Sequence, residues 1–313
     1  MTLAHTVPSF SVAIKQIGYQ STLSDRPLPL MVWYPTQAQE DQLVIGQVQL
    51  RVARNAEPLE GLYPLVVLSH GSMGSHLSHW KTAYFLASKG YVVATPVHAL
   101  DNAMDSRGSS TVKVWANRPR EWNAALDAVL NSELADSVNR QRVVAMGFSA
   151  GAYTALVAGG AQPSSSALER YCQTHPRHDV MCVNHGVMTR WLAQARQKMG
   201  WHRELLHPVE SIRAHAVIAM APVGEALFTA EGVKRLQLPT LLLQGNQDTV
   251  LSYPNDARYL RAQLTSRVDY CTVPGGHGVF LSVAEDGSET TANVDGLMQA
   301  HRLILNFLTS LGW

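Results

Sequence analysis

The stretch RVVAMGFSAGAYTALVAGG, which runs from Arg142 to Gly160, decides the fold. It opens with β-branched and apolar residues, passes through Gly147-Phe148-Ser149-Ala150-Gly151, and continues with small residues. The first part is typical of a buried strand and the last part of a closely packed helix. A serine between two glycines at this junction is either part of a permissive turn or an exposed nucleophile, and the rest of the chain distinguishes the two.

Apolar runs like the one before Ser149 recur along the chain. Most are continuous rather than alternating, which is the pattern of parallel strands buried on both faces. They lie at 28–35, 63–70, 91–96, 142–149, 215–222, 239–248 and 268–277. Helix-like segments separate them, and one of these, 118–134, has Pro119 near its start. This alternation predicts a doubly wound, mostly parallel sheet with helices on both faces, and segment 9–21 is expected to pair antiparallel at an edge.

Residues 161–213 interrupt this alternation. They are more polar and carry Trp191 and Trp201. We interpret them as a small helical cap inserted over the C-terminal edge of the sheet, where open α/β folds bind their ligands. The alternative is a surface excursion without a role in binding. The domain prediction is a core of 1–160 and 214–313 with a cap of 161–213.

Charge and hydropathy limit the partners. The formal net charge is +1 over 313 residues, so neither a nucleic acid nor an anionic membrane is an expected partner. No apolar run approaches the roughly 20 residues of a membrane span, so stable membrane insertion is not expected. The first residues show no basic segment followed by an apolar one, so no signal peptide is predicted. The expected compartment is the cytoplasm, or the periplasm or exterior if a leader was removed.

Cysteines and histidines give no metal signature. Cys172, Cys182 and Cys271 are the three cysteines, and the chain has no C-x-x-C motif, which argues against a zinc site or a disulfide scaffold. Cys172 and Cys182 are ten residues apart and would pair only in an oxidising compartment, so free thiols are expected. The thirteen histidines are scattered, and His76 and His79 stand beside His70 without an acidic neighbour. No metal site is predicted.

Three residues complete a nucleophile–base–acid set. Gly147 to Gly151 fits G-x-S-x-G between a strand and a helix, which makes Ser149 the candidate nucleophile. His277, between glycines after a strand, is the candidate base. Asp248, directly after an apolar strand, is the candidate acid that orients this base. Asp256 is the rival, but we expect it inside the next helix and facing solvent.

Acyl transfer also needs hydrogen-bond donors for a developing oxyanion. The amide of Ala150, directly after the nucleophile, is one candidate. The loop His70-Gly71-Ser72-Met73-Gly74 follows an earlier strand and supplies the second, for which we favour the amide of Ser72 over that of Met73. The alternative for this loop is a plain glycine-rich turn.

Taken together, these residues resemble the α/β-hydrolase superfamily over nearly the whole chain. The segments MVWYP, LVVLSHGSMGS, KGYVVATPVHA and NRPREW further resemble bacterial predicted dienelactone hydrolases, which are akin to platelet-activating-factor acetylhydrolases. The resemblance implies an α/β-hydrolase fold, a serine esterase or lipase-like activity, a small helical cap and no cofactor. Two positions depart from the pattern: Ser149 stands where true dienelactone hydrolases have cysteine, and His98 stands where the group often has an acidic residue. His98 either shapes the substrate pocket or is a polar loop residue.

The predicted function is hydrolysis of a small-molecule carboxylic ester through an acyl-enzyme with the set Ser149, His277 and Asp248. Candidate substrate contacts are Met73, His98 and Trp115. Short acyl esters are the default, and a bulky aromatic ester is the alternative if tryptophans line the pocket, which would involve Trp115, Trp122, Trp191 and Trp201. An acyltransferase, or a thioester or amide hydrolase, would use the same residues, and a non-catalytic ligand-binding homologue is the alternative of another class. A homodimer is left open.

Overall fold

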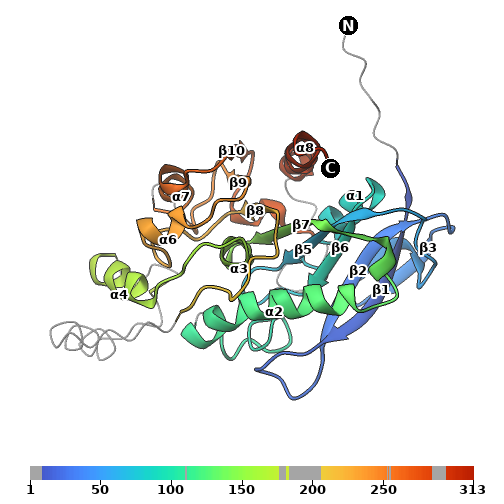
Figure 1. The fold of residues 1–313 in the computed structure, drawn as a ribbon, viewed down its shortest axis with the longest axis horizontal. Coiled ribbons are helices and arrows are strands. Elements are labelled where there is room, and N and C mark those ends of the chain that lie inside the picture. Colours follow the sequence, from blue (N-terminus) through green and yellow to red (C-terminus); the bar gives the residue numbers. More distant parts are fainter. Residues whose placement is uncertain are drawn as a thin grey trace, which may run out of the picture.

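The structure is a computed structural model, and it describes residues 9–109, 111–175, 181–182, 206–251, 253, 255–283 and 294–313. Over these residues the chain builds one continuous sheet between two layers of helices (Figure 1). No helix in these ranges is both long enough and apolar enough to cross a bilayer.

Ten strands form the sheet within the described residues, in the order β10-β9-β8-β7-β5-β6-β2-β1-β4-β3. The six strands from β10 to β6 in this order are parallel to one another. The strands are β1 (Ser11–Tyr19), β2 (Leu28–Thr36), β3 (Asp41–Ile45), β4 (Val48–Arg54), β5 (Tyr63–Ser69), β6 (Val92–Pro96), β7 (Val138–Phe148), β8 (Ala216–Met220), β9 (Thr240–Gly245) and β10 (Val268–Val273). This confirms the predicted mostly parallel sheet, whose central strands are the continuous apolar runs of the sequence.

The N-terminal strand is not at the edge, contrary to the prediction. β1 pairs antiparallel with β2 as expected, but its other side pairs with β4, and the hairpin partner β3 forms the edge. β4 alternates between buried and exposed residues over most of its length, and β3 is largely exposed. Because these strands lack a continuous apolar run, the pattern of buried parallel strands did not reveal them.

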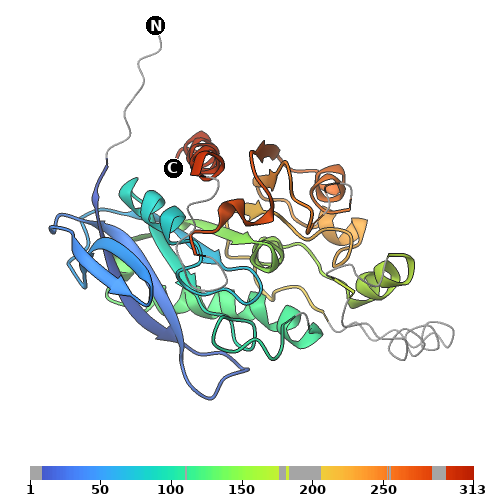
Figure 2. The ribbon, with the colours of Figure 1, turned by 180° about the vertical axis from the view of Figure 1, so that it is seen from behind.

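Helices cover both faces of the sheet (Figures 1 and 2). Leu86 of α1 and Ile304 of α8 pack into one apolar cluster, whereas Trp122 of α2 and Tyr153 of α3 pack into the other. The helices are α1 (Trp80–Ser88), α2 (Val112–Leu130), α3 (Ala150–Ala158), α4 (Ser165–Thr174), α6 (Ala230–Lys234), α7 (Ala257–Gln263) and α8 (Val294–Ser310), with 3-10 turns η1 (Ala135–Ser137) and η2 (His277–Phe280).

Pro119 lies inside α2 rather than near its start. The helix begins at Val112, where the side chain of Thr111 accepts a hydrogen bond from the amide of Val114. A proline has no amide hydrogen, so the carbonyl of Trp115 four residues earlier loses its helical partner. The hydroxyl of Tyr153 on α3 donates to that carbonyl at 3.0 Å. The interhelical contact therefore compensates for the proline, which explains why the helix continues through it.

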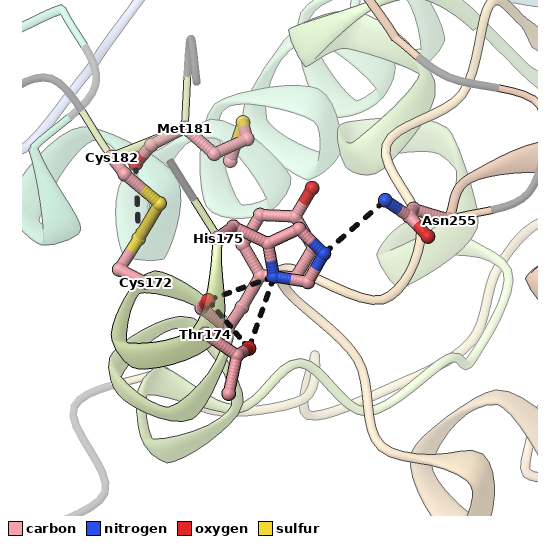
Figure 3. Close-up of a disulfide and its surroundings, with 7 residues drawn as sticks. Cys172, Thr174, His175, Met181, Cys182 and Asn255 are labelled. Carbon is pink, nitrogen blue, oxygen red and sulfur yellow. Dashed lines mark hydrogen bonds between the residues drawn. A yellow bond between two sulfur atoms is a disulfide. The ribbon is translucent and has the colours of Figure 1, made fainter. Parts of the chain in front are cut away.

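A disulfide joins Cys172 and Cys182, so the expectation of free thiols is wrong for this pair (Figure 3). The two Cα atoms are 5.4 Å apart, within the range a disulfide requires, a proximity that sequence spacing alone does not reveal. Cys172 lies near the end of α4, and the imidazole of His175 just beyond accepts a hydrogen bond from Asn255. Most of 176–205, with Trp191 and Trp201, lies outside the described residues, so the cap remains a prediction.

Candidate active site

Ser149 occupies a sharp turn between β7 and α3. Its backbone lies at φ 53° and ψ −116°, a left-handed conformation that costs a non-glycine residue energy and is found where a fold holds a functional residue. Its amide donates to the carbonyl of Met220 at the end of β8, which fastens the turn to the neighbouring strand. The turn leaves Ser149 partly exposed while both flanking residues are buried.

The two flanking glycines are required by close backbone contacts. A Cβ on Gly147 would lie 2.0 Å from the carbonyl oxygen of Gly151, and a Cβ on Gly151 would lie 2.0 Å from the carbonyl oxygen of Ser69. Any side chain would force the strand and helix apart. The glycines therefore allow β7, α3 and the end of β5 to meet at the serine.

Asp248 and His277 form a hydrogen-bonded pair beside this turn. The distance between His277 Nδ1 and Asp248 Oδ2 is 2.8 Å. The amides of Val250 and Leu251 donate to Oδ1 of the same carboxylate, and the side-chain amide of Gln244 donates to Oδ2. Burial opposes ionisation of Asp248, but the hydrogen bond and charge of His277 and the two amides outweigh it, so the pKa of Asp248 is lowered. An ionised Asp248 holds the hydrogen of His277 on Nδ1 and leaves Nε2 as an acceptor.

The loops that carry Asp248 and His277 are joined to each other. Asn246 donates its amide to the carbonyl of Val273, and Gln247 donates its amide to the carbonyl of Gly275. A Cβ on Gly245 would lie 2.6 Å from two carbonyl oxygens of the second loop. Because the two loops are in backbone contact, the separation between acid and base is set by the fold of both.

Phe148, which precedes Ser149, contacts the imidazole of His277. Its ring centroid is 4.8 Å from that of His277, and it also contacts the ring of His79. His79 donates from Nδ1 to the carbonyl of Phe280, at the end of the 3-10 turn that starts with His277. The structure therefore pairs His277 with Asp248 and places the imidazole against Phe148, the residue directly before Ser149.

The rival carboxylate Asp256 lies elsewhere. It precedes α7 instead of lying within it, and its side chain is buried instead of solvent-facing, so both expectations for Asp256 were wrong. Its Oδ1 accepts a hydrogen bond from the amide of Gly224. A carboxylate in this position serves to hold the loop after β8.

The loop after β5 presents an amide that has no acceptor among the described residues. That amide belongs to Ser72, and the amide of Ala150 at the start of α3 is also without one, which suits both to receive an external acceptor. The amide of Met73 donates to Asp101 Oδ1 at 3.1 Å, so it is already engaged. Of the two donors considered for this loop, the structure leaves Ser72.

Two of the three predicted substrate contacts are buried. His98 is fully buried, with Nδ1 2.7 Å from Glu121 Oε2 and Nε2 3.0 Å from the hydroxyl of Ser69. Trp115 packs edge-on against Tyr153 in the core, and Trp122, also considered for the pocket, is buried too. Neither His98 nor Trp115 is exposed in this structure, and their contact with a substrate stays a prediction. Met73 is 49% exposed and stands next to the free amide of Ser72.

A buried polar network lies behind this loop. Burial raises the pKa of Glu121 to about 7, and burial together with the charge of Arg118 lowers the pKa of His98 well below its usual value. Burial alone would raise the pKa of Asp101, but Arg118 and the hydroxyls of Ser109 and Ser72 outweigh it and bring the pKa to about 2. At neutral pH the network holds an ionised Asp101 against a charged Arg118.

Sequence reasoning did not identify Asp101, Arg118 or Glu121. They lie on separate segments, and Arg118 and Glu121 belong to a helix on which charged residues normally face solvent. The segment NRPREW, which contributes to the family resemblance, contains Arg118 and Glu121 but does not indicate a role for either, and no motif marks Asp101. Within the described ranges, no group of three or more His, Cys, Asp or Glu residues is placed to hold a metal ion.

Known proteins share this arrangement of strands and loops. The family described as Alpha/beta hydrolase family matches residues 66–291. Among solved structures, a ferulic acid esterase from Streptomyces cinnamoneus is similar over 98% of this chain and 91% of its own, with a TM-score of 0.62 and 19% sequence identity. At that identity the similarity shows the fold alone. No curated protein matches the sequence.

Proposed function

The chain belongs to the alpha/beta hydrolase family, and on this premise we propose that it is a serine hydrolase that cleaves carboxylic esters through an acyl-enzyme. The observation that carries the proposal is the hydrogen bond between His277 and Asp248. The imidazole of this pair contacts Phe148, directly before the left-handed turn at Ser149. The three residues occur in the chain order serine, aspartate, histidine, which is the order of this fold.

In the proposed mechanism, Ser149 Oγ attacks the ester carbonyl while its proton passes to His277 Nε2. Asp248 stabilises the imidazolium, because its carboxylate accepts the hydrogen on Nδ1. The negative charge that develops on the carbonyl oxygen is met by the amides of Ala150 and Ser72. His277 then gives the proton to the leaving alkoxide, which leaves the acyl group on Ser149 Oγ. In the second half, water attacks the acyl carbon while His277 takes its proton, and the bond to Ser149 Oγ then breaks as His277 returns that proton to Oγ and the acid is released.

We propose that the substrate is a small-molecule carboxylic ester. The fold neighbour is described as a ferulic acid esterase, so an ester of ferulic acid belongs in a test panel beside short acyl esters. A panel that also holds a lactone and a phospholipid examines the resemblance to dienelactone hydrolases and platelet-activating-factor acetylhydrolases, which remains a prediction. Added alcohols and amines test acyl transfer, since formation of free acid alone counts against it.

The decisive experiment is replacement of Ser149 by alanine. We expect the wild type to hydrolyse p-nitrophenyl acetate or butyrate and to be labelled by a fluorophosphonate, and the Ser149→Ala protein to lose both. Circular dichroism and the melting temperature serve as the folding control. A mutant that still labels and turns over would contradict the assignment of the nucleophile. A wild type that does neither would favour a non-catalytic binding protein.

A further inference from the structure

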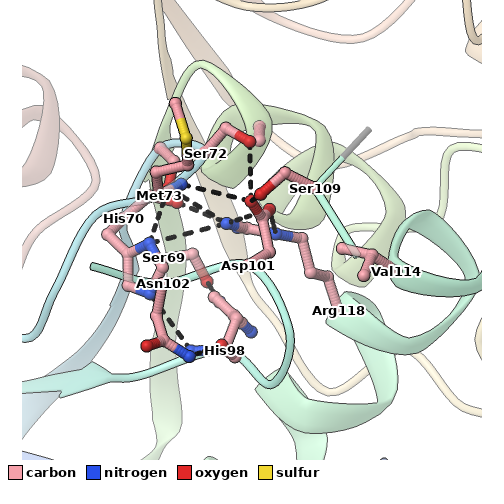
Figure 4. A network of polar contacts seen from close by, with 12 residues as sticks. Ser69, His70, Ser72, Met73, His98, Asp101, Asn102, Ser109, Val114 and Arg118 are labelled. Carbon is pink, nitrogen blue, oxygen red and sulfur yellow. Dashed lines mark hydrogen bonds and ion pairs between the residues drawn. The ribbon is translucent and has the colours of Figure 1, made fainter. Parts of the chain in front are cut away.

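The loop proposed to hold an oxyanion donor is fastened by one buried ion pair, Asp101 and Arg118 (Figure 4). Asp101 Oδ1 accepts hydrogen bonds from the hydroxyl of Ser72 at 2.6 Å and from the amide of Met73 at 3.1 Å. The hydroxyl of Ser109 donates to the same oxygen at 2.6 Å. The carboxylate therefore binds the C-terminal part of the loop, at Ser72 and Met73.

Arg118 binds the same loop by donating to two of the loop's backbone carbonyls. Its Nη1 donates to the carbonyl oxygen of His70 at 2.9 Å, and its Nη2 donates to that of Gly71 at 3.1 Å. Its Nε donates to Asp101 Oδ2 at 2.9 Å, and its side chain is fully buried. The guanidinium thus has three fixed partners, and the ion pair contacts four successive residues, from His70 to Met73.

The contact with Gly71 has a direct consequence for the amide of Ser72. The carbonyl of Gly71 and the N–H of Ser72 belong to one planar trans peptide, in which they point in opposite directions. A guanidinium that fixes the carbonyl of Gly71 therefore also fixes the direction of the Ser72 N–H. The Nδ1 of His70 contacts the same carbonyl at 2.6 Å and the amide of Gly74 donates to it at 3.2 Å, so three donors, Arg118 included, hold this peptide in one orientation.

We propose that Arg118, held by Asp101, is a positioning residue that orients the Gly71–Ser72 peptide so that the amide of Ser72 points at the substrate oxyanion. This rests on the proposed esterase function. It adds that the oxyanion hole depends on an ion pair whose partners stand 17 residues apart in the sequence. Neither side chain is expected to touch the substrate, because both are buried.

The test variant combines Arg118→Gln with Asp101→Asn, which removes both charges and keeps side chains of similar shape. In Arg118→Gln the side-chain nitrogen reaches about as far as Nε but lacks the two nitrogens that bind the carbonyls of His70 and Gly71. Asp101→Asn in the same protein avoids a buried unpaired charge, which would itself destabilise the fold, and keeps an oxygen for Ser72 and Met73. We expect kcat on p-nitrophenyl acetate to fall about 10²-fold with KM little changed.

A matched thionoester separates positioning from a folding defect. Sulfur is a weak hydrogen-bond acceptor, so a substrate with C=S gains less from the oxyanion hole than one with C=O. The ratio of kcat on the oxygen ester to kcat on the thionoester should therefore fall in the double variant. A loss of folded protein lowers both rates equally and leaves this ratio unchanged. Fluorophosphonate titration at its endpoint counts the active sites.

The matched control is the exposed pair Asp127 and Arg213, whose aspartate lies on the same helix α2. Asp127→Asn with Arg213→Gln should leave both kcat and the ratio unchanged. If the double variant at Asp101 and Arg118 does not fold, Arg118→Lys keeps the charge opposite Asp101 but has one nitrogen where three are used. It should lower the ratio as well.

The outcomes separate this proposal from the one it rests on. An active wild type combined with an unchanged ratio in both Arg118 variants overturns the positioning role and leaves the esterase proposal standing. A fall in kcat with an unchanged ratio also overturns it. A wild type without esterase activity and without fluorophosphonate labelling overturns the proposed function itself.

Discussion

Replacement of Asp248 by asparagine tests the proposed acid with almost no change of shape. The carboxylate accepts four hydrogen bonds in two groups. The backbone amides of Val250 and Leu251 donate to one oxygen, and the side chains of Gln244 and His277 donate to the other. An asparagine keeps one acceptor and presents two hydrogens in place of the second.

The orientation of this asparagine follows from its neighbours. Backbone amides cannot reverse, so the remaining oxygen will face Val250 and Leu251, and the NH₂ group will face Gln244 and His277. Gln244 can accept from this NH₂ group by rotating its own amide, which brings the buried, unpartnered Oε1 into use but gives up the hydrogen bond from Nε2 to the carbonyl of Leu251. His277 adapts by accepting at Nδ1, which moves its hydrogen to Nε2. The fold retains most of its hydrogen bonds, so we expect a loss of about 1 kcal/mol in unfolding free energy.

Activity should fall far more than stability. With its hydrogen on Nε2, His277 has no acceptor to take the proton of Ser149, and loss of the correct tautomer in a Ser-His-Asp triad costs about 10⁴-fold in kcat. This corresponds to about 5.4 kcal/mol in activation free energy. The assays are steady-state hydrolysis of p-nitrophenyl butyrate and urea unfolding of the same preparation.

The same substitution at Asp256 is the matched control. Its Oδ1 accepts from the amide of Gly224, and an asparagine oxygen can do the same, so Asp256→Asn should retain kcat. If Asp248→Asn keeps kcat within tenfold of the wild type, Asp248 does not orient the base. A large loss in Asp256→Asn instead would transfer that role to the rival carboxylate.

Two further predictions concern stability. Burial raises the pKa of Glu121 from 4.5 to about 7, so its stabilising contribution is complete below pH 4.5 and is lost as the pH rises through about 7. In Glu121→Gln, the free energy of unfolding, measured with urea at a series of pH values, should therefore no longer fall over this pH range. If it still falls, another group causes the decline. Cys172→Ser removes the disulfide and should lower the free energy of unfolding by about 3 kcal/mol for a loop of its length. Reductant should then lower the stability of this variant no further. Cys271→Ser, which removes a free thiol, is the control, and an equal loss there would contradict this account.

The parts of the site that could be predicted from the sequence are those set by local structure. Ser149 follows an apolar strand that the sequence pattern reveals, and the two glycines that its turn requires lie two residues before and after it. Asp248 and His277 each follow an apolar strand of the parallel sheet. Because the carboxyl ends of parallel strands meet at one edge, their proximity follows from the fold once the strands are recognised.

The parts that could not be predicted depend on contacts between distant segments. The hairpin of β3 and β4 alternates in polarity, and the proximity of Cys172 to Cys182 depends on the fold around α4. His98 is polar and follows a strand, as a pocket residue would, but the ring is enclosed by Glu121 and Ser69. The sequence shows where such side chains occur and not which of them the fold covers.

The ion pair behind the loop is better explained by geometry than by stability. A buried pair often contributes little to folding, since the cost of removing both charges from water offsets their attraction. Apolar residues of similar volume at Asp101 and Arg118 would avoid the cost of burying charge, but they could not hold the carbonyls of His70 and Gly71. The two halves of the site therefore differ in origin: close backbone contacts at the glycines place the nucleophile, whereas a long-range ion pair places the oxyanion donor. We expect variants of the pair to separate catalysis from stability, which substitutions at Gly147 or Gly151 cannot do because they disturb both.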